Sequence, residues 1–333
     1  MICIVAHHYV VNSGMIQLVM DSNELDFRSI FILLFGWGGK TGINCFVLIT
    51  GYFMCKSHIT LKKFLKLVFE RYFYAIILFA IFLITGYAKF SGISFLKMIF
   101  PFFTVQDNFM ACYLLFYLFI PFLNKLIGAL SEKEHLTLVG LFLFIYTILP
   151  SFAFAKVSFN YVTWFIILYL LAAYLRIYEK NWFKNTKLWM WLTIGSLVLS
   201  WMSVIILTYL GKRLGYPGLS YFLVNDCNKI LALTTAVFAF MFFKNVHIPQ
   251  SNFINKVAAS TLGVLLIHAN SDTMRQWLWG DFLKNTTYFE SPFLIIHAVG
   301  SVLGIYVVCT VIDQLRIKYV EMPVVSWVEN KRK

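Results

Sequence analysis

Long apolar runs separated by short polar segments dominate this sequence. The clear runs are Phe31–Met54, Tyr72–Tyr87, Phe109–Ile127, Leu136–Phe154, Tyr161–Tyr178, Leu188–Leu210, Ile230–Phe243, Val257–Ala269 and Phe293–Val311. Each is close to the roughly 20 residues that a helix needs to cross a hydrocarbon core of about 30 Å. None shows the alternation of apolar and polar residues that barrel strands show. The pattern predicts an all-α fold, a polytopic transmembrane helix bundle of about ten helices.

Two further apolar segments are shorter. Ile93–Phe103 is typical of a re-entrant or interfacial segment, and Met1–Val11 is too short to cross a membrane. Since Met1–Val11 has neither a basic start nor a small-residue cleavage site, it does not fit a signal peptide. We expect it to be the second half of a first helix that is truncated here. The connections are short, so residues 1–333 are expected to form a single membrane-embedded domain.

Composition and charge add an orientation. Hydrophobic residues make up 60% of the chain and charged residues 13%, against about 45–50% and about 25% in soluble proteins. Most of the formal charge of +13 lies in alternate loops, as the positive-inside rule describes. The loop from Lys56 to Arg71 and the C-terminus are therefore expected to be cytoplasmic. Because the basic residues are dispersed over loops, nucleic-acid binding is not expected.

The six cysteines indicate no metal site. No CxxC pair and no His/Cys spacing suited to zinc occurs. The cysteines are therefore interpreted as small residues that pack inside the bundle.

Polar side chains inside apolar runs are the candidates for chemistry, since they are costly in a membrane. His7 and His8 are the first case, and adjacent helix residues point about 100° apart, so only one of them can face a given site. Both could instead lie at the headgroup boundary. His268 is the second case, followed by Asn270 and Arg275; an ordinary hydrogen bond at a helix end is its alternative.

A basic run marks the start of the third apolar segment. Lys62, Lys63, Lys66 and Arg71 could hold phosphates or anchor the helix to anionic lipid. Separately, the glycines of Gly36-Trp-Gly-Gly39…Gly42 lack the context of a phosphate-binding loop. They are expected to kink the helix or to allow close backbone approach.

Five segments stand out by their order and spacing: Ile4-Val-Ala-His-His-Tyr9, Phe46-Val-Leu-Ile-Thr-Gly-Tyr-Phe53, Lys62-Lys63-Phe-Leu-Lys66…Arg71-Tyr72, Asn108-Phe-Met-Ala-Cys-Tyr-Leu-Leu-Phe-Tyr117…Pro121-Phe-Leu-Asn124 and Gly263-Val-Leu-Leu-Ile-His268. Together they resemble acyltransferase family 3, which includes bacterial polysaccharide O-acetyltransferases. The family's first helix carries an Arg eleven residues before its His. Counting back from His8 runs past Met1, and the Pro often found after the basic run is missing.

The resemblance implies an O-acyltransferase of the plasma (inner) membrane. The donor would be acetyl-CoA or another acyl-CoA, with no resident cofactor, and the acceptor a hydroxyl of a polysaccharide or lipid-linked glycan. His8 would act as general base or transient acyl carrier, and His268 would line the cavity or polarise the acyl carbonyl. Arg71, with Lys62, Lys63 and Lys66 behind it, would bind CoA phosphates. The remaining cavity candidates are His7, Tyr113, Tyr117, Trp164, Asn270 and Arg275.

Two alternatives stay open. A flippase or transporter of lipid-linked oligosaccharide would have the same composition, although no duplicated halves are visible. An inactive truncated relative would keep the bundle without the chemistry. The sequence predicts neither the acceptor glycan nor the oligomeric state.

Overall fold

The computed structural model describes residues 1–22, 24–104, 108–152, 155, 157–158 and 160–324. Within these residues the chain forms helices and no strand, which confirms the predicted all-α fold. Six helical segments are long and apolar enough to cross a membrane: Phe27–Met54, Leu61–Ile84, Phe109–Ala129, Glu132–Phe152, Thr186–Leu214 and Leu294–Val324. The bent pair Ile2–Val11 and Met15–Asp21 is a seventh candidate.

The elements match these spans with several breaks. The first half of the chain contains α1 (Ile2–Val11), α2 (Met15–Asp21), α3 (Phe27–Gly36), α4 (Gly39–Met54), α5 (Leu61–Ile84), α6 (Gly92–Ile99), α7 (Phe109–Ala129), α8 (Glu132–Leu143) and α9 (Leu149–Phe152). The second half contains α10 (Tyr161–Ile177), α11 (Thr186–Leu214), α12 (Ile230–Asn245), α13 (Asn252–Ala259), α14 (Thr261–His268), α15 (Asp272–Arg275) and α16 (Leu294–Arg316).

Two expected segments differ in detail. The run Val257–Ala269 is divided at Ser260, where α13 ends and α14 begins. The segment around Ile93–Phe103 forms the short helix α6 and a following 3-10 turn, too short to cross a membrane by themselves. Apolar content alone cannot distinguish a continuous span from two short helices, because both bury the same kind of residue.

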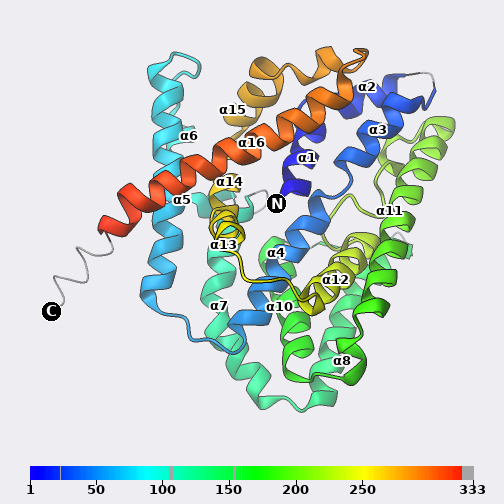
Figure 1. Cartoon of the computed structure of the whole chain (residues 1–333), viewed down its shortest axis with the longest axis vertical. Coiled ribbons are helices and arrows are strands. Elements are labelled where there is room, and N and C mark those ends of the chain that lie inside the picture. Colours follow the sequence, from blue (N-terminus) through cyan, green and yellow to red (C-terminus); the bar gives the residue numbers. More distant parts are fainter. Residues whose placement is uncertain (23, 105–107, 153–154, 156, 159, 325–333) are drawn as a thin grey trace.

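Helix α1 is central to the arrangement. It packs against α3, α4 and α16, while α14 packs against α16 and α5. In Figure 1 α1 rises from the middle of the molecule toward α2, and α16 runs obliquely across the view past α1 and α14. The C-terminal parts of α1 and α14 meet inside the bundle, where His8 lies 2.9 Å from His268. The basic residues 331–333 of the C-terminus lie outside the described residues.

Helix α1 packs closely on α4 because the residues of α4 that face it are glycines. A Cβ atom at Gly39 would lie 2.3 Å from Cγ of His7, and one at Gly42 would lie 2.8 Å from Cγ1 of Ile4. Both distances are too short for real atoms, so only glycine allows this approach, as small residues do in other membrane bundles. The helix also breaks between Gly36 and Gly39. The close approach expected of the glycine run is thus confirmed.

A buried charge cluster joins α5 to α16. The guanidinium of Arg316 contacts three carboxylates, at 2.9 Å from Asp313, 2.7 Å from Glu321 and 3.3 Å from Glu70. Lys66 from α5 contacts Glu321 at 2.7 Å. Buried charges are tolerated when they are paired, and this pairing fixes the start of α5 against the end of α16.

Candidate active site

His8 and His268 form a hydrogen-bonded pair where α1 and α14 meet. The Nδ1 atom of His8 lies 2.9 Å from Nε2 of His268, and the ring centroids are 5.1 Å apart. His268 is fully buried, while His8 is partly accessible. The structure thus brings together the two residues that the sequence singled out as catalytic, although 260 positions separate them.

The hydrogen bonds assign the protons of the neutral pair. The Nδ1 atom of His268 lies 2.6 Å from the carbonyl oxygen of Val264. Since a carbonyl only accepts, His268 must donate from Nδ1, which leaves its Nε2 atom as an acceptor. His8 therefore donates from Nδ1, and its Nε2 atom carries the lone pair. The arrangement leaves one basic nitrogen, on the partly accessible ring.

His7 has a different partner. Its Nδ1 atom lies 2.6 Å from the carbonyl oxygen of Gly36, at the end of α3. The last carbonyls of a helix have no partner within that helix, so His7 satisfies one of them. As expected from the 100° between adjacent residues, only His8 reaches His268. His7, a predicted cavity residue, caps the break between α3 and α4.

Lys40 is a polar residue that the sequence analysis missed. It lies near the middle of the Phe27–Met54 span, next to the glycine that packs on His7, and donates to the hydroxyl of Tyr161 at 2.6 Å. Its second partner is Asp226 at 3.8 Å. A single lysine within a long apolar run indicates a functional or structural role, and this was the signal for Lys40. The sequence analysis interpreted the neighbouring glycines and did not consider the lysine between them.

The segment that carries Asp226 is held in place by α4. Asn44, one turn after Lys40, donates to the carbonyl of Cys227 at 2.7 Å and accepts from the indole N–H of Trp164 at 2.9 Å. Irregular backbone inside a membrane protein needs such internal partners. Trp164, a predicted cavity residue, is fully buried in this network.

The remaining aromatic candidates are packed. Tyr113 is 6% exposed and its hydroxyl lies 3.0 Å from that of Thr50. Tyr117 is 5% exposed and its ring stacks on Phe64. These contacts are those of core residues, so a substrate would reach either ring only after local movement.

Asn270 and Arg275 follow His268 on the same side of the bundle. Asn270 donates to the carbonyl of Leu266 at 3.0 Å, and Arg275 pairs with Asp272 at 3.1 Å. Arg275 is the first cation after His268 in the sequence. Asn270 ends the α14 turn.

The basic run occupies the first three turns of α5. Lys62 and Lys63 are exposed, and Lys66 is engaged by Glu321. Arg71 is buried, donates to the carbonyl of Met98 and lies over the ring of Tyr72. Of the four predicted phosphate ligands, Lys62 and Lys63 thus remain on the surface, whereas Arg71 fixes α6 to α5. In the part of the chain that the structure describes, no group of three or more His, Cys, Asp or Glu residues is arranged to hold a metal ion.

Comparison with known proteins agrees with the geometry. No curated protein and no solved structure matches the chain. One family model, described as an acyltransferase domain, matches residues 1–313. This match includes both histidines, the basic run of α5 and most of α16. The chain therefore belongs to acyltransferase family 3 and is a multi-pass membrane acyltransferase.

Proposed function

We propose that the protein transfers an acyl group, in the simplest case acetyl, from acyl-CoA to a hydroxyl of a polysaccharide or lipid-linked glycan. The single observation that carries this proposal is the His8–His268 pair. It supplies one basic imidazole nitrogen inside a membrane bundle, and acyl transfer to a hydroxyl requires such a base.

The reaction needs one proton to move. The Nε2 atom of His8 takes the proton of the acceptor hydroxyl as its oxygen attacks the thioester carbonyl. The tetrahedral intermediate collapses, the carbon–sulfur bond breaks, and the proton passes from His8 to the departing sulfur. The products are the O-acyl ester and free CoA. Each ring completes the cycle in its starting state, so no bound cofactor is consumed.

His268 supports this step by holding His8. Both of its nitrogens are engaged, by Val264 and by His8, so polarising the acyl carbonyl would require breaking one of these bonds. The contact with His268 strengthens when His8 becomes cationic, since hydrogen bonds from charged donors are stronger. The same logic makes the aspartate of a serine protease triad an orienting group. We infer a positioning role for His268.

The distribution of charge supports a cytoplasmic donor. The connection between α4 and α5, which carries Lys56, lies at the end of the bundle opposite α2 and α15 (Figure 1). By the positive-inside rule this end faces the cytoplasm, where acyl-CoA is available. Helix α1, which carries His8, then runs toward the opposite side, where a glycan acceptor of the cell envelope would approach. The same orientation gives a cytoplasmic C-terminus in the plasma membrane.

The test is acyl transfer by the purified protein in lipid nanodiscs, with radiolabelled acetyl-CoA and envelope glycan from the source cell. The wild type is expected to form glycan ester, and His8→Ala to lose it. His247→Ala is the matched control, because His247 is exposed in the loop before α13. Ester formation by His8→Ala at the wild-type rate would refute the general-base assignment. Glycan transport without consumption of acetyl-CoA would instead support a flippase.

A further inference from the structure

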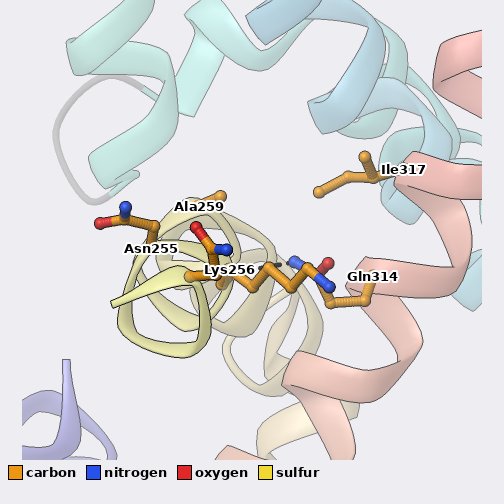
Figure 2. A pocket seen from close by; sticks show the side chains of 6 residues that line it. Asn255, Lys256, Ala259, Gln314 and Ile317 are labelled. Carbon is orange, nitrogen blue, oxygen red and sulfur yellow. Dashed lines mark hydrogen bonds between the residues drawn. The ribbon is translucent and has the colours of Figure 1, made fainter. Parts of the chain in front are cut away.

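An open surface cavity of about 390 Å³ lies between α13 and α16 (Figure 2), and the residues on its α13 side are exposed. Its lining residues are Asn252, Asn255, Lys256, Ala259, Gln314 and Ile317. A volume of a few hundred Å³ is typical of small-molecule sites. The lining combines three side-chain amides, one cation and one apolar side chain.

The sequence of α13 places its polar side chains on the cavity. Asn252, Asn255, Lys256 and Ala259 are spaced as i, i+3, i+4 and i+7, which is one face of a helix. Phe253 is 75% exposed on another face. An amphipathic helix of this kind is typical of a membrane interface. The cavity is therefore on the polar side of an amphipathic helix.

Gln314 builds the opposite wall. Its side-chain nitrogen donates to the carbonyl of Lys256 at 2.9 Å and to the hydroxyl of Ser260 at 2.6 Å. These bonds join α16 to the junction of α13 and α14 and leave the Oε1 atom of Gln314 without a hydrogen bond among the described residues. Figure 2 shows the Lys256 side chain extending from α13 toward Gln314, with Ile317 on the next turn of α16.

The cavity is connected to the candidate active site through α14. Helix α14 begins two residues after Ala259 and rises by about 11 Å from Thr261 to His268 at 1.5 Å per residue. An extended pantetheine arm can span this length. Beyond the cavity, Glu321 lies one turn after Ile317 and pairs with Lys66 of α5 at 2.7 Å.

We propose that this cavity binds the adenine nucleotide end of the acyl-CoA donor. The inference rests on the proposed function and adds to it the site of donor recognition. Asparagine and glutamine amides match the hydrogen-bonding edge of adenine, Ile317 offers an apolar contact for the ring, and Lys256 pairs with a phosphate. The pantetheine arm then runs along α14 and delivers the thioester to His8.

Binding of CoA, which carries no acyl group, tests this inference without requiring catalysis. The full chain is placed in nanodiscs, and labelled CoA is titrated and then displaced by adenosine bisphosphate, which represents the nucleotide end alone. Lys256→Gln and Asn255→Leu are each expected to weaken CoA binding about tenfold, the loss of one charge-assisted or bidentate contact. Adenosine bisphosphate should compete in the wild type and lose affinity in both variants.

Lys187→Gln is the matched control, since Lys187 is an exposed lysine at the start of α11, and it should bind CoA as the wild type does. Thermal unfolding of each variant shows that the fold is kept, as expected for surface positions. Equal CoA binding by the wild type, Lys256→Gln and Asn255→Leu would overturn the cavity assignment and leave the proposed function standing. Absence of CoA binding in the wild type would overturn the acyl-CoA donor itself.

Discussion

The imidazole of His8 donates from Nδ1 to Nε2 of His268 across 2.9 Å, and the backbone carbonyl of Val264 fixes the direction of this bond. His268→Phe should lower the rate of acyl transfer about a hundredfold, because misplacing a catalytic group costs that much. His268→Gln should recover part of the loss, since its amide can both donate and accept.

The measurement is the separation of kcat from KM for acetyl-CoA. A positioning role lowers kcat and leaves KM nearly unchanged. His8→Ala should lose about a hundredfold to ten-thousandfold. Equal rates for His268→Phe and His268→Gln would contradict the positioning role.

Adding a single methyl group at Gly39 is expected to lower both stability and activity. Gly39→Ala places a Cβ atom within 2.3 Å of the His7 ring, so α1 must move away from α4. We expect a loss of about 1–3 kcal/mol of stability and a lower acyl-transfer rate, because His8 moves with α1. Gly140→Ala is the control: Gly140 is a helical glycine of α8 with no atom near its Cβ position, so alanine should be neutral or stabilise by up to about 1 kcal/mol. A fully active Gly39→Ala protein would mean that α1 is free to shift.

Lys40 and Asp226 are expected to be energetically coupled. Lys40→Met removes the bond to Tyr161 and leaves the Asp226 carboxylate without this cation. The single variant should lose about 1–3 kcal/mol, and the double variant with Asp226→Asn less than the sum of the two. Unfolding in detergent, followed by tryptophan fluorescence, gives the coupling energy, expected at about 0.5–3 kcal/mol. Strict additivity would show that the pair contributes nothing.

Arg316 is expected to be the most sensitive cation of the bundle. Arg316→Met leaves Glu70, Asp313 and Glu321 buried without it, and breaking a buried ion pair in this way costs about 3–5 kcal/mol. The exposed pair Arg28–Glu290 at 2.6 Å is the comparison, and Arg28→Met should lose less than about 1 kcal/mol. Thermal unfolding in the same detergent compares the two variants. Similar losses would mean that burial does not govern the strength of these pairs.

Asp26, which lies just before the first residue of α3, is expected to make the stability of the protein depend on pH. Its carboxylate accepts from the backbone N–H of Ser29 at the start of α3, and this bond lowers the pKa of Asp26 below its usual value. A lowered pKa in the folded state stabilises the protein above the unfolded-state pKa near 3.8, and this contribution disappears as the pH falls through the folded-state value. Asp26→Ala should therefore lose about 1 kcal/mol at pH 7, and progressively less as the pH falls below 3.8. A loss that does not depend on pH would refute the capping role.

The sequence predicted the helical class and most spans because apolar runs reveal burial directly. It also predicted that only one of His7 and His8 would reach a given site, since helical geometry separates adjacent side chains. It could not predict that His8 meets His268, because this contact joins distant positions through the packing of α1 and α14. Their polar character inside apolar runs made both residues candidates, and the resemblance to a known family selected His8 over His7 and implied their roles.

Lys40 and the cavity between α13 and α16 illustrate what the sequence left out. Lys40 was visible as a single charge, but its partners Tyr161 and Asp226 come from other parts of the chain. The predicted ligands Lys66 and Arg71 were chosen for charge, and charge alone did not reveal that Glu321 and the carbonyl of Met98 engage them. The sequence could not reveal these partners, because they lie far along the chain and are brought near only by the tertiary fold.

The glycine surface under α1 also sets the register of that helix. A slip of α1 by one residue would turn its side chains by about 100° and would present His7 or Tyr9 to α14 in place of His8. The side chains of His7 and Ile4 pack directly on Gly39 and Gly42. This packing holds α1 at one position along α4. An insertion in α1 would thus change the side chain that faces α14, and so the chemistry of the site, while the helical fold is kept.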